Sequence, residues 1–300
     1  MAFRSVLLLP LSCLAFVGAA NDPPAATYRA SVSEVRVTFF ATDQNNRPVE
    51  NIREDDFAIV DNEMVVRDFR SLVRSDQTEL DLAVVVDASE SVAPRFQEAL
   101  NEVLQLFAQR QLASDENVSL VMFGGVQPAV ICSRNCRSPG AGQRLLEMKA
   151  AGATPLFDAL VRGANLIANR QTAGIRPVLL LFSDGNDTIS RTSAREALEA
   201  IIAIDALLYT VDLNKPEQTS NGSAVLQRMA AATGGRFFSR REGAVNVLQT
   251  ALDDLRASYV VTYPLPSQAI GFHSLRIFPR HNLNLRFHCR NGYYYEPTIP

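Results

Sequence analysis

Two kinds of hydrophobic pattern alternate along the chain. From about residue 30 to residue 74, apolar and polar residues alternate in three short runs, 31–43, 55–61 and 65–73, each expected to be a strand. From residue 80 onward, runs that are apolar throughout alternate with segments whose apolar residues recur every three or four positions. Strands buried on both faces and amphipathic helices produce these two patterns. The sequence therefore predicts β structure first and an α/β region after it.

The α/β region is predicted to be a doubly wound, mostly parallel sheet flanked by helices. Strands that alternate with helices of this length form βαβ units with right-handed crossovers. Ligands of such sheets bind outside the carboxyl ends of the strands, where the strand order reverses. The expected strands are 80–87, 117–123, 128–133, 176–185, 206–213 and 236–239, and the expected helices are 92–112, 155–170, 193–205, 223–235 and 244–259.

The alternating pattern returns after Tyr259, so β segments flank the α/β region at both ends. We predict a small antiparallel β domain built from both ends of the chain, residues 29–74 and 264–297. The α/β domain, residues 78–263, is expected to be inserted between these two parts.

The first 20 residues have the pattern of a signal peptide. Arg4 is followed by an apolar stretch over 6–17 and by the small residues 18–20. The stretch is too short to span a bilayer, and no later segment is long and apolar enough. We predict cleavage after Ala20, a flexible lead over 21–28, and export to the periplasm or the extracellular space. Lipidation of Cys13 is the minor alternative, because the apolar run continues past it.

Composition and motifs argue against two function classes. The formal net charge is −3 and no block of basic residues is present, so nothing suggests nucleic-acid binding. The chain has no G-x-S-x-G nucleophile elbow and no glycine-rich phosphate loop, and its three histidines lie far along the sequence from the acidic motifs. We therefore expect a protein that is not an enzyme.

The cysteines of the mature chain fit an exported protein, in which disulfides persist. Cys132 and Cys136 lie four residues apart, between an expected strand and an expected helix. A local disulfide and two free thiols both fit this spacing, and the compartment favours the disulfide. Cys289 lies in an alternating strand pattern, where we expect it to be buried.

Polar side chains stand where the expected strands end. Asp87, Ser89 and Ser91 follow one buried strand, Thr154 precedes a helix, and Asp184 follows another buried strand. Each group alone could serve as a helix cap or a turn. Together they form a set of hard oxygen donors at one edge of a sheet, which suits Mg²⁺, Mn²⁺ or Ca²⁺ and suits Zn²⁺ or copper poorly. Two carboxylates and three hydroxyls leave such an ion short of ligands, so an acidic oxygen from outside could complete it.

These motifs resemble the von Willebrand factor A (VWFA) domain with its metal-ion-dependent adhesion site (MIDAS). The D-x-S-x-S motif matches at Asp87, Ser89 and Ser91, the threonine of the G-x-T-P-L context matches at Thr154, and the aspartate of S-D-G matches at Asp184. The resemblance implies that these five residues hold Mg²⁺, with Mn²⁺ or Ca²⁺ as alternatives.

The segments on both sides also resemble bacterial VWFA-related proteins, found notably in acidobacteria, over residues 30–297. We therefore expect an exported binding or adhesion protein, in which an exposed Asp or Glu of a protein partner completes the metal site. Glu90, Asn186 and Asp187 are expected at the partner-binding rim, together with residues 124–127. The alternative is a structural or assembly module of the cell envelope, in which the metal mainly stabilises the fold.

Overall fold

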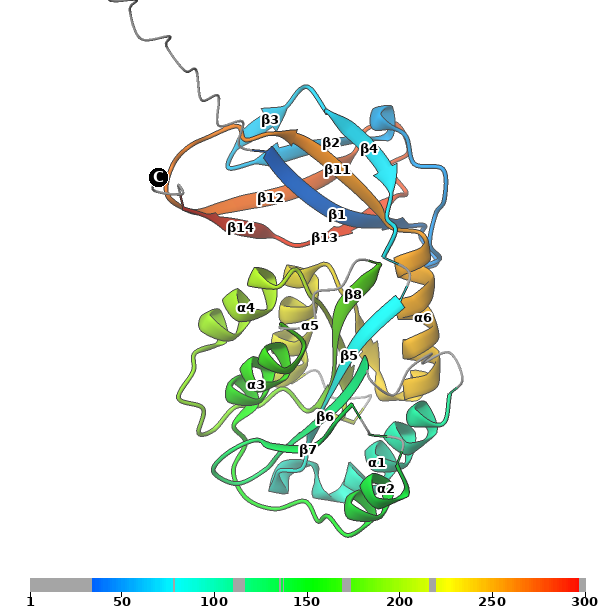
Figure 1. Cartoon of the computed structure of the whole chain (residues 1–300), viewed down its shortest axis with the longest axis vertical. Coiled ribbons are helices and arrows are strands. Elements are labelled where there is room, and N and C mark those ends of the chain that lie inside the picture. The colour runs from blue at the N-terminus through cyan, green and yellow to red at the C-terminus, as the bar shows by residue number, and fades with distance from the viewer. Residues whose placement is uncertain are drawn as a thin grey trace, which may run out of the picture. The chain divides into compact units, whose positions relative to one another are not determined.

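A six-stranded sheet forms the centre of the α/β part in the computed structural model (Figure 1), which describes residues 34–77, 79–109, 117–134, 136, 138–168, 174–215 and 220–296. The strand order is β10-β9-β8-β5-β6-β7, and every neighbouring pair except β6 and β7 is parallel. The strands are β5 (Glu79–Asp87), β6 (Val118–Phe123), β7 (Ala129–Ser133), β8 (Ile175–Ser183), β9 (Leu207–Asp212) and β10 (Phe237–Ser239).

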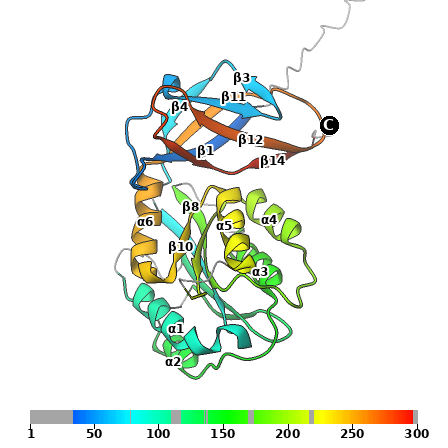
Figure 2. The same cartoon turned by 180° about the vertical axis from the view of Figure 1, so that it is seen from behind.

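Helices cover both faces of this sheet (Figure 2). One face packs against α1 (Ala93–Phe107), α2 (Pro139–Leu146) and α6 (Ala244–Arg256). The other packs against α3 (Leu156–Ala168), α4 (Ala194–Ala203) and α5 (Asn221–Thr233). The central strands are buried on both sides, as their continuous apolar sequences predicted. The predicted doubly wound α/β class is confirmed.

The strand order reverses between β5 and β8. After β5 the chain adds β6 on one side, and it later returns to add β8 on the other side. Because Val86 is paired with Phe182, the ends of the two strands lie next to each other, at Asp87 and Ser183. This is the position at which a doubly wound sheet opens a crevice for a ligand.

Two four-stranded antiparallel sheets make up the β part, with orders β13-β1-β11-β4 and β14-β12-β2-β3. They share one apolar core that contains Phe39, Phe57, Val261 and Leu275. The strands are β1 (Glu34–Thr42), β2 (Phe57–Asp61), β3 (Met64–Val66), β4 (Ser71–Arg74), β11 (Tyr259–Pro264), β12 (Gly271–Pro279), β13 (Arg286–Cys289) and β14 (Gly292–Tyr295). Both sheets combine strands from the two ends of the chain, as predicted.

Two details of the prediction were wrong. The α/β domain was expected to run to residue 263, but β11 pairs with β1 and β4 and so belongs to the β part. A buried strand has the same apolar pattern in either kind of sheet, so the sequence does not show which sheet takes it. The single strand expected over 65–73 is two strands, β3 and β4, which lie in different sheets.

Ser33–Pro300 form one compact unit, in which the two parts are joined by specific contacts. Arg236, beside β10, donates to the Asn46 carbonyl at 2.7 Å and lies over the Phe40 ring of β1. Among the described residues, no helix has the length and apolar character needed to cross a membrane. The expected signal peptide (1–20), the lead (21–28) and Cys13 lie outside the described residues.

Candidate metal centre

Asp87 ends β5 and is fully buried. Its Oδ1 accepts from the Ser89 backbone N–H at 2.9 Å, and its Oδ2 accepts from the Ser183 hydroxyl at 2.7 Å. Burial raises the pKa of this carboxyl to about 6, against the lowering effect of these hydrogen bonds, and the charge of Asp184 raises it further. The carboxylate is therefore fixed in place, and a positive charge beside it would stabilise its ionised form.

Ser89 and Ser91 bring two hydroxyls together on the loop after β5. Their Oγ atoms are 3.1 Å apart, with Ser89 buried and Ser91 exposed at the short 3₁₀ helix η2 (Glu90–Val92). The loop is held by backbone hydrogen bonds, since Glu90 N–H donates to the Gly152 carbonyl at 3.0 Å. These contacts direct two neutral oxygens to the same place beside Asp87.

Thr154 and Asp184 contribute oxygens that form no bond with the residues that the structure describes. Thr154 is fixed through its backbone, which exchanges hydrogen bonds with Thr188, whereas its hydroxyl bonds to no residue that the structure describes. Asp184 Oδ1 accepts from Asn186 N–H at 3.1 Å, and its Oδ2 bonds to none of the described residues. Both side chains are almost fully buried, at 3% and 2% exposure.

Backbone hydrogen bonds join the loops after β5, β6 and β8 to the segment before α3. Ala151 N–H donates to the Ala88 carbonyl, Gly125 N–H to the Ala153 carbonyl, and Thr188 N–H to the Thr154 carbonyl, at 2.8 to 2.9 Å. The five predicted residues therefore belong to one network of joined loops at the carboxyl edge of the sheet. In the described part of the chain, no three His, Cys, Asp or Glu side chains gather as a metal cluster, so this candidate centre depends on hydroxyls as well as carboxylates.

The rim of the centre differs in part from the expectation. Glu90 and Asn186 are exposed, as a partner-binding rim requires. Asp187 instead accepts from Leu156 N–H at 2.9 Å and from the Ser190 hydroxyl, so it caps the start of α3. Asp158, in the first turn of α3, accepts from the N–H groups of Arg191 and Thr192 at 3.1 and 2.9 Å.

Sequence reasoning missed three hydroxyls that support the centre. Ser183 bonds both Asp87 and the Gly185 N–H, while Thr188 and Ser190 hold the loops around Thr154 and α3. A serine at the last position of a buried strand was a usable signal for Ser183, because buried hydroxyls need partners. The sequence carries no comparable signal for Thr188 and Ser190, which lie in a polar loop.

Cys132 lies on β7, an edge strand of the six-stranded sheet, and Cys289 lies on β13 of the β part. A disulfide joins Cys132 and Cys136, whose Cα atoms are 5.2 Å apart. Cys289 is free and partly buried, and burial raises the pKa of its thiol to about 12, so the thiol is protonated at neutral pH.

Comparison with known proteins shows which family the α/β part resembles. Residues 82–186 match the model of the von Willebrand factor type A domain. This chain contains a VWFA domain. The match covers most of β5, all of β8 and all five candidate ligand residues.

One curated relative of this VWFA protein is the magnesium-chelatase 67 kDa subunit of Chlorobaculum parvum, 28% identical over 172 residues. The alignment covers 51% of this chain and only 27% of that subunit.

Two solved structures are similar at low identity. An aerotolerance-related membrane protein from Bacteroides fragilis is 16% identical, with a TM-score of 0.42 over 59% of this chain and 98% of that one. Proximal thread matrix protein 1 from the mussel byssus is 14% identical, with a TM-score of 0.42 over 63% of this chain and 49% of that one.

Proposed function

We propose that this VWFA protein is an exported, non-enzymatic binding protein whose α/β domain holds a divalent cation, with Mg²⁺ as the preferred ion. Asp87, Ser89, Ser91, Thr154 and Asp184 would hold the ion, and a Glu or Asp of a protein partner would complete it. The observation that carries this proposal is the state of the oxygens at the edge of the sheet. The Thr154 hydroxyl and Asp184 Oδ2 have no bond to any described residue, beside a buried carboxylate whose pKa is raised.

The five residues divide by role. The hydroxyls of Ser89, Ser91 and Thr154 are neutral oxygens suited to direct ligation. Asp87 already accepts a hydrogen bond on each oxygen, which suits it to orient bound waters and to balance charge. A cation beside Asp87 would favour its ionised form and so offset the cost of its burial.

The charge at the site favours an acidic partner. Two carboxylates balance a divalent ion, so a third carboxylate from outside meets a neutral centre with ligand positions still open. The surroundings offer further contacts, since Glu90 and Asn186 are exposed and the side chains of Val126 and Ile189 are 70% and 43% exposed. The protein would then recognise the partner's acidic residue through the metal, and the residues of the partner next to it through this rim.

The donor atoms limit the choice to three hard cations, and one relative favours Mg²⁺ among them. The donors are all oxygens, which suits Mg²⁺, Mn²⁺ and Ca²⁺. The relative from Chlorobaculum parvum is named for magnesium chelation, and it aligns with 51% of this chain.

The test is capture of a partner with and without the metal. The full mature chain is immobilised and exposed to envelope and extracellular proteins of the source cells in Mg²⁺ or in EDTA, and bound proteins are identified by mass spectrometry. Asp87→Ala is the site variant, and Asp253→Asn, a surface residue paired only with its helix neighbours, is the control. We expect a protein bound in Mg²⁺ by the wild type and the control, and lost with EDTA and in Asp87→Ala.

Equal capture by the wild type, the control and Asp87→Ala, in Mg²⁺ and in EDTA, would contradict the metal-dependent mechanism. If Mg²⁺ raises the melting temperature but no protein is captured, the metal serves the fold, and the envelope module becomes the better account.

A further inference from the structure

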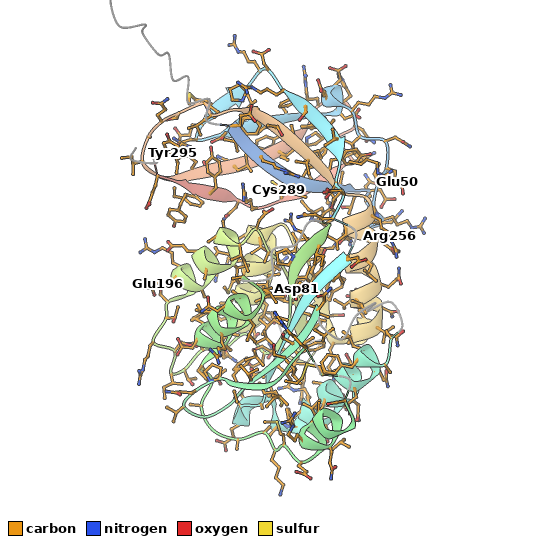
Figure 3. The ribbon with its side chains drawn as sticks, in the orientation of Figure 1. Glu50, Asp81, Glu196, Arg256, Cys289 and Tyr295 are labelled. Carbon is orange, nitrogen blue, oxygen red and sulfur yellow. A yellow bond between two sulfur atoms is a disulfide. The ribbon has the colours of Figure 1, made fainter. Side chains whose placement is uncertain are left out.

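A cavity of about 330 Å³ lies at the opposite edge of the sheet from the candidate metal centre. Its lining comes from the start of β5 and β8, from the ends of α3 and α4, from β1, and from Arg290 after β13. Asp81 on β5 and Cys289, the residue before Arg290, are labelled in Figure 3. Asp81 and Asp87 are six positions apart on β5, which is about 20 Å at the rise of a strand. The cavity and the candidate metal centre are therefore separate sites.

One wall of the cavity is aliphatic. Ile167, Ile175, Pro177 and Ile204 line it, and all four are buried or partly buried. Small-molecule sites are typically cavities from about 300 Å³ upward with mainly apolar walls and a few placed polar groups. The volume and this wall therefore suit a small ligand with an aliphatic body.

The facing wall is cationic and comes from the β part. Inward residues of β1 such as Val37 build the core of that part, so the alternate residues Arg36 and Thr38 face outward and line the cavity. The Arg36 guanidinium forms no hydrogen bond or ion pair with any residue in the described part of the chain. Arg290 joins it there, and Arg290 Nη2 donates to the backbone carbonyl of Arg36 at 2.9 Å, which fixes the two residues together.

The acidic residues nearby do not neutralise this wall. Asp205 is shared, because its Oδ2 accepts from Arg176 at 2.8 Å and its Oδ1 from Arg290 at 3.3 Å. Asp81 is only 2% exposed and has an interaction of its own. Arg36 and Arg290 line the cavity together with Asp81 and Asp205, and Arg176 bonds to Asp205 from outside the lining. Arg36 is therefore the cation left to bind an anion.

We propose that this cavity binds a small monocarboxylate with an aliphatic body, whose carboxylate meets Arg36 and Arg290 and whose chain lies against the isoleucine wall. Arg presents paired N–H donors that match the two oxygens of a carboxylate. A divalent cation is disfavoured by the unpaired guanidinium of Arg36, and an inorganic anion would leave the aliphatic wall without a partner. The ligand would touch both parts of the protein, so its binding would stabilise their junction.

The experiment compares three probes on the full chain by calorimetry and by melting temperature. Hexanoate has both features, hexan-1-ol has the chain without the charge, and inorganic phosphate has the charge without the chain. We expect hexanoate to raise the melting temperature in a saturable way and to bind at least tenfold more tightly than either other probe. Hexanol or phosphate binding as tightly as hexanoate would overturn the proposal, as would the absence of saturable hexanoate binding.

Variants assign the effect to the two walls. Arg36→Gln keeps the backbone carbonyl that Arg290 uses, and we expect it to weaken hexanoate binding about tenfold or more while the unliganded melting temperature changes little. Ile204→Ser should weaken hexanoate binding because it places a hydroxyl in the aliphatic wall. This second variant keeps the test decisive if Arg36→Gln folds poorly. Arg276→Gln, an exposed arginine of β12 outside the cavity, is the control and should bind hexanoate as the wild type does. Equal binding by all three variants would contradict the assignment.

Discussion

Buried polar residues determine how this protein responds to its surroundings at the scale of single side chains. Asp87, Ser183 and Asp184 are buried and support the candidate metal centre, while the partly buried His288 lies at the junction of the two parts. Its ring stacks on Phe40 with centroids 4.6 Å apart, and its Nε2 is 3.0 Å from the Thr42 hydroxyl. Burial, and then the charges of Arg236 and Arg286, lower the pKa of His288 to about 4.

This shift predicts a loss of stability in acid. The unfolded chain takes up a proton on this histidine near pH 6.5, whereas the folded chain resists it down to about pH 4. Folding stability should therefore fall as the pH falls from about 6.5 to 4, by up to about 3 kcal/mol from this group. His288→Gln should reduce the fall in urea-unfolding free energy between pH 7 and pH 5. His281→Gln, at an exposed position, is the control, and the same pH dependence in all three proteins would refute the prediction.

The candidate metal residues could be predicted from the sequence, but their supports could not. Asp87, Ser89 and Ser91 stand together after an apolar run, and a parallel sheet brings Thr154 and Asp184 to the same edge. Ser183 acts on Asp87 only because β5 and β8 are neighbours, 96 residues apart in the chain. Asp187 likewise was expected at the rim and caps α3, because its Leu156 partner comes from a distant segment.

At the scale of elements, a close approach between two glycines positions the Asp184 loop. Gly185 has a φ of +78°, and a Cβ on either Gly185 or Gly222 would overlap backbone atoms of the other segment. Gly222 lies in the first turn of α5, so this helix sets where the loop after β8 can lie.

Gly222→Ala should therefore displace the Asp184 loop. We expect a loss of about 2–4 kcal/mol of unfolding free energy, since the new methyl meets backbone that cannot move aside cheaply, together with a weaker response to Mg²⁺. Gly142→Ala in α2 is the control, because its Cβ would meet only a Leu104 side-chain atom at 4.0 Å. That variant should gain about 0.5–1 kcal/mol from helix propensity. An unchanged Mg²⁺ response in Gly222→Ala would contradict the role of this contact.

The elements themselves were largely predictable, and their assignment to sheets was less so. Periodicity located the strands and helices of the α/β part because each has a strong apolar face. It did not show that Tyr259–Pro264 leaves that part, since pairing with β1 is a contact between chain segments more than 200 residues apart.

At the scale of the whole molecule, the apolar cores follow the two parts of the chain. The two cores of the α/β part contain residues from Leu80 to Leu255. The core of the β part contains residues from Val35 to Leu72 and from Tyr259 onward. No buried core residue in the described ranges is shared between them. The inserted part therefore has what it needs to fold alone.

A fragment of residues 79–257 should accordingly be soluble and unfold cooperatively, and it should keep the full chain's response to Mg²⁺. It should fail to respond to hexanoate, because Arg36 and Arg290 are absent. Circular dichroism and melting curves beside the full chain test this, and an unfolded fragment would contradict the separation of the cores.

The most direct test of the central claim is a Mg²⁺ titration of the full chain by calorimetry and melting temperature. Asp184→Asn removes one charge while keeping the oxygen that Asn186 N–H uses, and Glu90→Gln removes a matched charge from the rim. The account predicts saturable binding in the wild type and in Glu90→Gln, a melting temperature that rises with Mg²⁺, and affinity at least tenfold weaker in Asp184→Asn. A wild type that shows neither heat nor a shift with Mg²⁺, Mn²⁺ or Ca²⁺, or an Asp184→Asn variant that matches it, would contradict the claim.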